Sequence, residues 1–494
     1  MKARPHRAHG ALPWRTLDAP LTGAERRQLQ RSLHALLVWQ KDLRAWTPCR
    51  SAPDALPFVA LYAGGRLFGC MGSDEGSPGE RLARAFLRAL SDQRFAAVSR
   101  QGRGSLVASV SYMRGVRMRS EAELLAEVEL GTQGIGLLPA AGGGPVILLP
   151  SVAREGGLTA PQLVATLLQK ANLPAGADFS LFLFDTEMVV ARLGARGTEA
   201  MAPVDAAAAW LARLVAADGK VAFAVDPRTG EARAIGPMHH GRSATVLQAL
   251  ALHGGHARRV AKGRAWLERE ARAALGGRPI EGWPTDPAMV AGTLALAVLA
   301  GARLAPELAA FVASTPAVAK TPWHAAQVAC ALGAETPEPV WRACVADLET
   351  RPWSPWTTLA ARVRGDGATL ARAEAALVAS VRSEGPYVGG VASGTPSGIP
   401  ETAITAVTAE ALGPSRRADA RAAVRRARGF LERLQCSEAG PAMAHASCFG
   451  AFPASPVAML LRGDVTAHAA IALHGAATAE PGRKTARREA DPVR

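Results

Sequence analysis

The chain has 494 residues, 49% of them hydrophobic, and a formal net charge of +15 at pH 7. This length exceeds that of an ordinary domain, and the apolar content suffices for more than one hydrophobic core, so we expect two domains. Ten basic and three acidic side chains lie in residues 1–50, which therefore carry +7 of the net charge. This uneven distribution indicates a basic arm rather than a nucleic-acid groove, and we expect no specific nucleic-acid binding.

The sequence also lacks the signals of secretion and membrane insertion. No apolar core of a signal peptide follows the basic N-terminus, and the apolar run Pro287–Ala302 is shorter than the roughly 20 residues that span a bilayer. The six cysteines are too widely spaced for a disulfide framework. Arg far outnumbers Lys, and Ala, Gly and Pro are abundant, as in proteins of GC-rich bacteria. We expect a bacterial, cytoplasmic protein with reduced thiols.

Composition divides the chain into four parts. We expect a basic disordered arm over residues 1–19 and a mixed α+β domain over residues 20–198. An all-α helical domain follows over residues 203–476, after a boundary in the Gly- and Ala-rich stretch Leu193–Pro203. The polar, basic tail over residues 477–494 is expected to be disordered.

The first domain starts with a predicted β-hairpin. Phe58–Tyr62 is partly β-branched and aromatic, Ala63–Gly65 is a turn signal, and Arg66–Phe68 forms the return strand. Further along, the hydrophobic pattern predicts two strands and two amphipathic helices. The strands are Leu106–Met113 and Val146–Leu149, and the helices are Gly79–Leu90 and Ala160–Ala171.

A lone cysteine, Cys70, follows this hairpin at a predicted strand end. Glycines flank it, and glycine allows a positive φ or a close approach of the backbone to a ligand. Cys70 is therefore a candidate catalytic nucleophile, and Arg66 and Arg94 are the cations expected to lower its pKa. The ligand-binding residues predicted around it are Arg66, Gly69, Gly72, Ser73 and Arg94. Alternatively, Cys70 is a small buried thiol that fills a tight corner of the core.

An ordered set of motifs in this domain resembles the signature of the AMMECR-one domain family. Six segments of the family's signature have counterparts here, in the same order. Leu67–Ser73 corresponds to Leu-Arg-Gly-Cys-Ile-Gly-Thr, Asp92–Phe95 to Asp-Pro-Arg-Phe, Val110–Met113 to Val-Ser-Val-Leu, Gly131–Gly134 to Gly-x-x-Gly, Leu148–Ala153 to Leu-Leu-Pro-x-Val-Ala and Lys170–Pro174 to Lys-Ala-Gly-Leu-Pro. The resemblance implies Memo-like or radical-SAM proteins as partners. Among the positions that differ, Phe68 replaces the signature arginine, Ser73 replaces the threonine and Gln93 replaces the proline. If that arginine holds an anion in the family, the contact is missing here.

The second half of the chain alternates two kinds of helical segment. Six apolar segments are expected at Gly241–Leu250, Asp286–Leu299, Pro322–Leu332, Trp356–Val363, Glu401–Leu412 and Asp464–Leu473. Six more charged, amphipathic segments are expected at Asp205–Ala217, His256–Leu275, Ala305–Ala313, Pro339–Leu348, Thr369–Val381 and Ser415–Leu434. The apolar segments start 45, 36, 34, 45 and 63 residues apart, a spacing typical of helical hairpins with insertions. The alternation predicts an inner and an outer ring of helices.

This arrangement resembles the (α/α)6 toroids shared by terpenoid cyclases, lanthionine cyclases, sugar epimerases and several glycosidases. In such a fold the inner helices start at the central cavity, so we predict an acid–base pocket there for a polar or sugar-like substrate. Its predicted catalytic residues are Glu401, Asp464 and His468, and its ligand-binding residues are His240 and Arg242. Further residues at inner helix starts are His239, Asp286, Trp323, His324 and Trp356. Alternatively, Asp286 and Asp464 are ordinary helix N-caps, and Glu401 is a favourable first-turn acid.

Metal and cofactor signals are weak. Cys436, His445 and Cys448 have a spacing loosely suited to zinc, but no fourth ligand is evident, so we predict two buried thiols and no metal site. No phosphate-binding loop or dinucleotide fingerprint is present, and no cofactor can be assigned. Two functions remain: a small-molecule-handling enzyme or enzyme partner with sites at Cys70 and in the toroid, or a non-catalytic scaffold that binds partners. An open toroid lined by acids would favour the enzyme, and a toroid whose centre is filled by apolar side chains would favour the scaffold.

Overall fold

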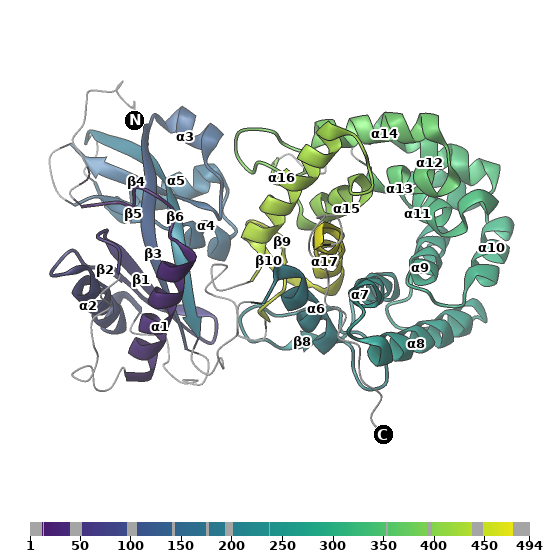
Figure 1. The fold of residues 1–494 in the computed structure, drawn as a ribbon, viewed down its shortest axis with the longest axis horizontal. Helices are drawn as coiled ribbons and strands as arrows, with labels where there is room; N and C mark the ends of the chain where they lie inside the picture. The colour runs from purple at the N-terminus through teal and green to yellow at the C-terminus, as the bar shows by residue number, and fades with distance from the viewer. Residues whose placement is uncertain are drawn as a thin grey trace.

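The computed structural model describes residues 12, 14–39, 52–95, 106–140, 144–173, 177–192, 201–236, 238–351, 354–392, 398–436 and 448–477. Within them, an N-terminal α+β region lies beside a helix-rich C-terminal region (Figure 1). The expected C-terminal tail and most of the expected basic arm fall outside the described residues. No helix among the described residues is both long and apolar enough to cross a membrane.

The N-terminal region is built on a six-stranded antiparallel sheet with the order β2-β1-β3-β6-β4-β5. Its strands are β1 (Pro57–Ala63), β2 (Arg66–Gly72), β3 (Val107–Arg119), β4 (Gln133–Pro139), β5 (Val146–Leu148) and β6 (Phe179–Arg192). β1 and β2 form the predicted hairpin. The long β6 joins the two ends of the sheet, because it pairs with β3 along most of its length and with β4 along its first half.

Alternate residues of the strands face opposite sides of the sheet. Val59 and Leu61 of β1 and Val110 of β3 pack with the two helices α1 (Gly23–Trp39) and α2 (Pro78–Leu90). Ala60 and Tyr62, on the opposite face of β1, belong to a separate buried cluster. The remaining helices of this region are α3 (Glu121–Glu127), α4 (Pro150–Gly156) and α5 (Ala160–Ala171). The sheet therefore has one face covered by helices and a second face that is available to line a site.

Twelve helices make up most of the described C-terminal region. Six of them pack in a closed sequence in which each contacts the next and the last contacts the first: α7 (His239–His253), α9 (Pro287–Leu299), α11 (Pro322–Leu332), α13 (Pro355–Arg364), α15 (Thr402–Leu412) and α17 (Gly463–Ala477). The other six lie outside them in Figure 1: α6 (Pro203–Leu214), α8 (Ala257–Leu275), α10 (Ala305–Ser314), α12 (Glu338–Thr350), α14 (Gly367–Ser380) and α16 (Ala418–Leu434). Every helical segment expected from the sequence is confirmed as a helix.

The expectation of a purely helical second domain is wrong. A four-stranded sheet with the order β8-β7-β10-β9 joins the start of this region to its end. Its strands are β7 (Ala224–Val225), β8 (Ala232–Arg233), β9 (Pro453–Ser455) and β10 (Ala458–Arg462). Strands of two to five residues are too short to show a clear period-2 pattern.

The two regions are tightly docked. Gly131, with φ +79°, lies so close to β9–β10 that an added Cβ would be 2.3 Å from the Pro456 carbonyl oxygen. The Tyr387 hydroxyl donates a hydrogen bond of 3.4 Å to the Leu130 carbonyl. One continuous apolar cluster also includes residues of both regions, such as Leu183 and Trp210. β6 ends at Arg192 and α6 begins at Pro203, so neither element crosses the predicted boundary.

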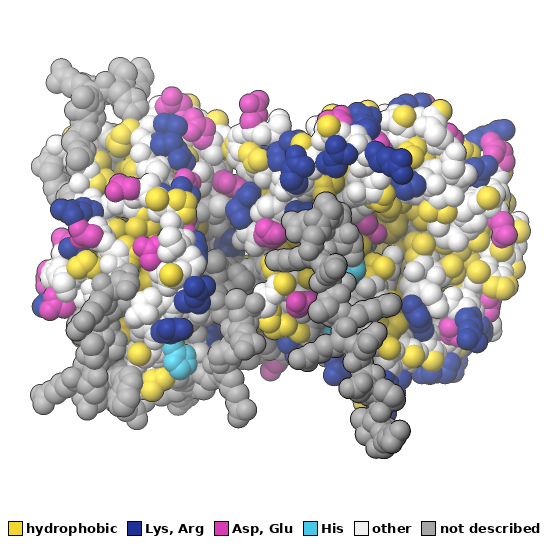
Figure 2. All heavy atoms as spheres, in the orientation of Figure 1, with side chains coloured by type: hydrophobic (Ala, Val, Ile, Leu, Met, Phe, Trp, Pro, Cys, Tyr) yellow, Lys and Arg dark blue, Asp and Glu magenta, His cyan; other side chains and the backbone are white. Residues whose placement is uncertain are grey.

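Basic side chains are spread over the face that Figure 2 shows. They are dense over α14 and α16, and acidic side chains lie among them. Arg421, Arg425 and Arg433 of α16 are exposed. The excess positive charge is thus distributed over helix surfaces rather than confined to the N-terminal arm.

Candidate functional site

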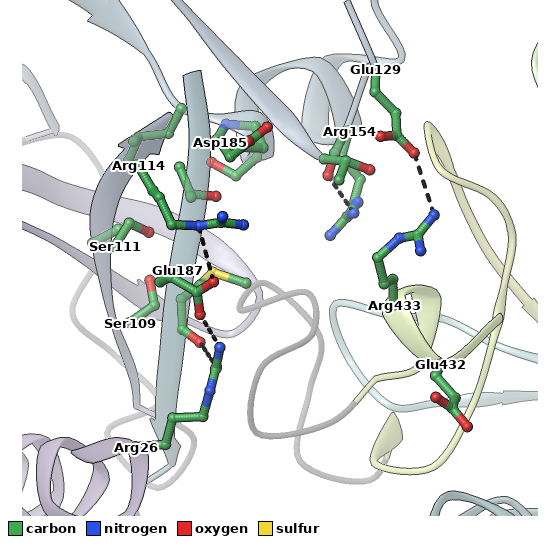
Figure 3. Close-up of a pocket in the computed structure, with 18 of the residues that line it drawn as sticks. Arg26, Ser109, Ser111, Arg114, Glu129, Arg154, Asp185, Glu187, Glu432 and Arg433 are labelled. Carbon is green, nitrogen blue, oxygen red and sulfur yellow. Dashed lines mark hydrogen bonds and ion pairs between the residues drawn. The ribbon is translucent and has the colours of Figure 1, made fainter. Parts of the chain in front are cut away.

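A cavity of about 410 Å³ lies where the sheet of the N-terminal region meets α16 (Figure 3). It forms because β4 pairs with β6 only from Phe179 to Asp185. Beyond this point β6 continues without β4 beside it, and Thr186, Glu187 and Met188 line the cavity. On the other side of the gap, the turn at Gly131 and the start of α4 form the opposite wall.

Small polar side chains line much of the sheet wall. Ser109 and Ser111 of β3 contribute hydroxyl groups, and Ala60 of β1 lies directly opposite Ser109 in the strand register. The Tyr62 hydroxyl donates a hydrogen bond of 2.9 Å to Glu155 Oε1. Burial raises the pKa of Tyr62 and of Glu155. The wall thus offers hydrogen-bonding groups at fixed positions.

Glu187 is the acidic centre of one side of the cavity. Its carboxylate forms an ion pair with Arg26 of α1, and Arg26 Nη1 also donates 3.1 Å to the Met188 carbonyl. Arg114 of β3 lies 3.5 Å from the same carboxylate, through Nε to Oε1. Glu187 is buried, so these contacts are partly shielded from water. The Glu187 carboxylate is therefore shared by two guanidinium groups, those of Arg26 and Arg114.

Two more acids of the lining, Glu129 and Asp185, have charged or polar partners. Arg433 of α16 lies 3.8 Å from Glu129 and donates 3.1 Å to the Val388 carbonyl. Asp185 accepts from Gln133 Nε2 at 2.9 Å and lies 3.4 Å from Arg117. These two acids are therefore already engaged.

Arg154 of α4 is held differently. Its Nε donates 3.1 Å to the Pro456 carbonyl and its Nη2 donates 2.5 Å to the Gly131 carbonyl. Burial lowers its pKa below the usual arginine value. Among the described residues, Arg154 takes part in no ion pair. It braces both regions and presents a positive charge to the cavity.

Cys70 lies behind this wall, as the strand neighbour of Ala60. The prediction of a strand-end loop is wrong, because Cys70 belongs to β2, which continues to Gly72. Burial raises the pKa of its thiol to about 11, and the positive charges of Lys170 and Arg94 only partly oppose this. The thiol is therefore mostly protonated near neutral pH, contrary to the expected lowering of its pKa.

The residues around Cys70 serve the packing of the N-terminal region. An added Cβ on Gly69 would lie 1.8 Å from the Ala89 carbonyl oxygen of α2, and one on Gly72 would lie 3.1 Å from the Phe58 ring. Phe68 is buried in the cluster between the sheet and α1 and α2. Ser73 is also buried, and its Oγ accepts from the Glu75 amide at 3.5 Å. The glycines thus allow close approach of helix and ring rather than of a ligand.

Arg94 holds the backbone beside Cys70. Its Nη2 donates 2.6 Å to the Cys70 carbonyl and 2.7 Å to Asp92 Oδ2, and that oxygen also accepts from the Cys70 amide at 3.1 Å. The hydrogen bonds from Arg94 lower the pKa of Asp92 to about 2. Arg66 is exposed at the start of β2. The structure therefore brings Arg94, but not Arg66, into contact with the Cys70 segment.

The predicted residues of the helical ring do not converge on one point. Asp464 is held by Arg462 at 3.0 and 2.7 Å and lies 3.6 Å from Arg242. His240 is instead buried among aromatic rings, stacked 5.0 Å from Trp266. Desolvation lowers the pKa of His240 to about 4. Arg242 and Asp464 thus lie together, whereas His240 belongs to an aromatic cluster.

His468 has a partner that the sequence did not indicate. Its Nδ1 lies 3.7 Å from Glu410 Oε2, and Trp356 packs edge-on against its ring at 6.0 Å. Trp356 comes from α13 and His468 from α17, so their contact reaches across the ring past α15. Glu401 occupies the N-cap position of α15 without a side-chain cap hydrogen bond.

Capping explains Asp286, whose Oδ1 accepts from the Met289 amide at 3.0 Å. His324 bonds Gln327 at 3.0 Å within α11, and His239 packs against Trp266. Trp323 lies under the Arg351 guanidinium, 5.8 Å from it. These contacts give the helix starts structural partners.

Cys436 and Cys448 are buried, as predicted, and burial raises the pKa of Cys436 to about 12. His445 lies outside the described residues. The described part of the chain holds no cluster of three or more potential metal ligands.

Sequence reasoning missed the charged residues of the cavity. Arg26, Arg114, Arg154 and Arg433 are distant from one another in the sequence and belong to α1, β3, α4 and α16. Arg154 could have been noticed from the sequence, because it directly follows the Leu148–Ala153 motif. The others carry no motif, since only folding brings them together.

Comparison with known proteins identifies the N-terminal region. The AMMECR1 family model matches residues 24–189, and these residues form an AMMECR1 domain. An uncharacterised protein from Pyrococcus horikoshii, PH0010, aligns with 34% of the chain and 89% of its own length, at 22% identity and a TM-score of 0.27. A glycosidase structure aligns with 55% of the chain and 95% of its own length, at 12% identity and a TM-score of 0.32. No curated protein matches the sequence.

Proposed function

We propose that this protein binds a small polar molecule in the cavity between its AMMECR1 domain and α16. The observation that carries the proposal is the lining itself, which combines arginines, acids and hydroxyl groups from both regions in a space of about 410 Å³. Pockets for small ligands usually have volumes of roughly 300–1,000 Å³ and hold a few well-placed polar groups. The AMMECR1 domain alone would lack the wall that Glu432 and Arg433 provide.

We also propose that residues 203–476 adopt an (α/α)6 toroid. The closed sequence of contacts among α7, α9, α11, α13, α15 and α17 supports this assignment. In this proposal the helical region contributes α16 as a wall of the cavity, and the β9–β10 turn holds Arg154 through the Pro456 carbonyl. In this proposal Cys70 supports the cavity wall and does not react, because it lies behind Ala60 and its raised pKa favours the neutral thiol.

A cavity-filling variant tests the binding proposal. The full chain and Thr132→Trp would each be equilibrated by dialysis against a bacterial metabolite extract, and the retained compounds identified by mass spectrometry. We expect one class of compound to be enriched by the wild type and lost in Thr132→Trp, because the indole would occupy the space that the ligand needs.

The matched control is Thr166→Trp, since Thr166 lies on α5 and does not line the cavity. This variant should enrich the same compounds as the wild type. Equal enrichment by Thr132→Trp, or no enrichment by the wild type, would refute the proposal.

A further inference from the structure

Two guanidinium groups extend into the cavity from facing walls (Figure 3). Figure 3 shows Arg114 and Arg154 pointing toward each other from opposite sides of it. Arg114 extends from β3 in the sheet wall, and Arg154 extends from α4 in the facing wall. Like charges repel, so this arrangement is unfavourable unless a negative charge lies between them.

The protein supplies only part of that negative charge. Glu187 lies 3.5 Å from Arg114, but it also pairs with Arg26. Arg114 Nε has no hydrogen-bond partner among the described residues, although it is buried. One carboxylate shared by two guanidinium groups leaves one positive charge in excess on this side.

Arg154 adds a second excess charge. Both of its hydrogen bonds to described residues go to the backbone carbonyls of Gly131 and Pro456, which orient the group but carry no formal charge. Its neighbour in the chain, Glu155, is bonded to Tyr62 and has a raised pKa. Glu155 does not line the cavity, so it adds no acidic group to its wall.

The remaining acids of the lining do not correct the balance. Glu129 faces Arg433 at 3.8 Å, and Asp185 lies 3.4 Å from Arg117. Glu432 is exposed on α16, and Figure 3 shows it apart from the two facing guanidinium groups. Glu187 is thus the lining acid that lies against Arg114, and none of the ion pairs among the described residues includes Arg154.

We propose that the ligand of this cavity is a small anion whose phosphate or carboxylate group bridges Arg114 and Arg154. This inference rests on the proposed binding function and specifies its ligand class. Guanidinium groups recognise both oxyanions through paired N–H donors in a planar fork. Ser111, which also lines the cavity, adds a hydroxyl donor from the same strand as Arg114. A bound oxyanion would provide the counter-charge that the protein lacks there.

The test measures anion binding by the full chain. Inorganic phosphate and succinate would be titrated by calorimetry at constant ionic strength, with sodium chloride as the balancing salt. We expect saturable binding of at least one of them by the wild type and a loss of about tenfold or more in affinity in Arg114→Gln, because one of two charged donors is removed. Phosphate and succinate serve as separate arms that distinguish a phosphorylated from a carboxylated ligand.

Two further variants sharpen the result. Arg117→Gln removes a nearby arginine that pairs with Asp185 and does not line the cavity, so anion affinity should stay within about twofold of the wild type. Glu187→Gln removes the carboxylate that competes for Arg114, so affinity should rise if the variant remains folded by circular dichroism. A neutral or cationic ligand would not produce this rise.

Unchanged anion affinity in Arg114→Gln, or equal losses in Arg114→Gln and Arg117→Gln, would overturn the proposal. Absence of saturable binding of both anions by the wild type would overturn it as well. The broader binding function would survive these outcomes if Thr132→Trp still abolished enrichment of a neutral compound. The two proposals can therefore fail separately.

Discussion

Single arginine side chains hold the walls of the cavity in place. Arg26 ties α1 to β6, through Glu187 and the Met188 carbonyl. Arg154 joins the AMMECR1 domain to the β9–β10 turn through two carbonyl groups. Each of these residues both supports the fold and places a positive charge in the site. Substitutions of Arg154 would therefore change stability and binding together, which is why Arg114 is the better residue to test.

Two buried histidines make the helical region sensitive to acid. Desolvation lowers the pKa of both His239 and His240 to about 4, whereas an unfolded histidine has a pKa of about 6.5. The unfolded state therefore binds more protons between these values, and stability falls as the pH decreases through this window. Above about pH 6.5 the full stability is present.

We expect the free energy of unfolding to decrease by about 1–2 kcal/mol per histidine between pH 7 and pH 5. Urea denaturation followed by tryptophan fluorescence would measure it, because Trp266 and Trp283 contact His240. His240→Phe should reduce the pH dependence, since one of the two titrating groups is removed. An identical pH dependence in wild type and variant would show that other groups cause the acid sensitivity.

The contact between β2 and α2 depends on one glycine. Because an added Cβ on Gly69 would lie 1.8 Å from the Ala89 carbonyl oxygen, Gly69→Ala must displace α2 from the sheet. We expect a loss of about 2–4 kcal/mol in the free energy of unfolding, measured by chemical denaturation. Gly144→Ala is the control, since a Cβ there meets no atom within 4 Å. A small effect of Gly69→Ala, similar to that of the control, would contradict the assigned packing role.

Helical elements could be predicted closely from the sequence, because their hydrophobic period is a local property. The expected segments Ala160–Ala171 and Pro322–Leu332 match the observed helices at both ends. β6 was not anticipated, although it is the longest strand among the described residues, since Phe179–Arg192 is buried on both faces and lacks clear alternation. Tertiary pairing rather than local pattern defines this element.

The candidate site was less predictable than the helices. The sequence pointed to Cys70 because of its flanking glycines, but those glycines serve the packing of α2 and Phe58. Arg242 and Asp464, two of the predicted pocket residues, lie near one another. Glu410, the partner of His468, lies late in α15 rather than at a helix start, so a rule based on helix starts excluded it. Convergence of distant charged residues is a property of the complete fold.

The two regions are expected to unfold together. A continuous apolar cluster includes residues of both, and the cavity lies at their junction. The Gly131 turn is central to this junction, because it contacts the Pro456 carbonyl and receives the hydrogen bond from Arg154. Ligand binding at the junction would then stabilise both regions at once, by mass action.

Gly131→Ala tests this coupling. The added Cβ would lie 2.3 Å from the Pro456 carbonyl oxygen, so the two regions must move apart. We expect the single calorimetric unfolding transition of the wild type to split into two, with the earlier one several degrees lower. Gly157→Ala is the matched control, because Gly157 also has a positive φ, +59°, but a Cβ there meets no atom within 4 Å. Positive-φ strain alone costs about 1 kcal/mol, so this control should lower the transition temperature slightly and leave a single transition. Splitting in both variants, or in neither, would show that contact between Gly131 and Pro456 does not couple the two regions.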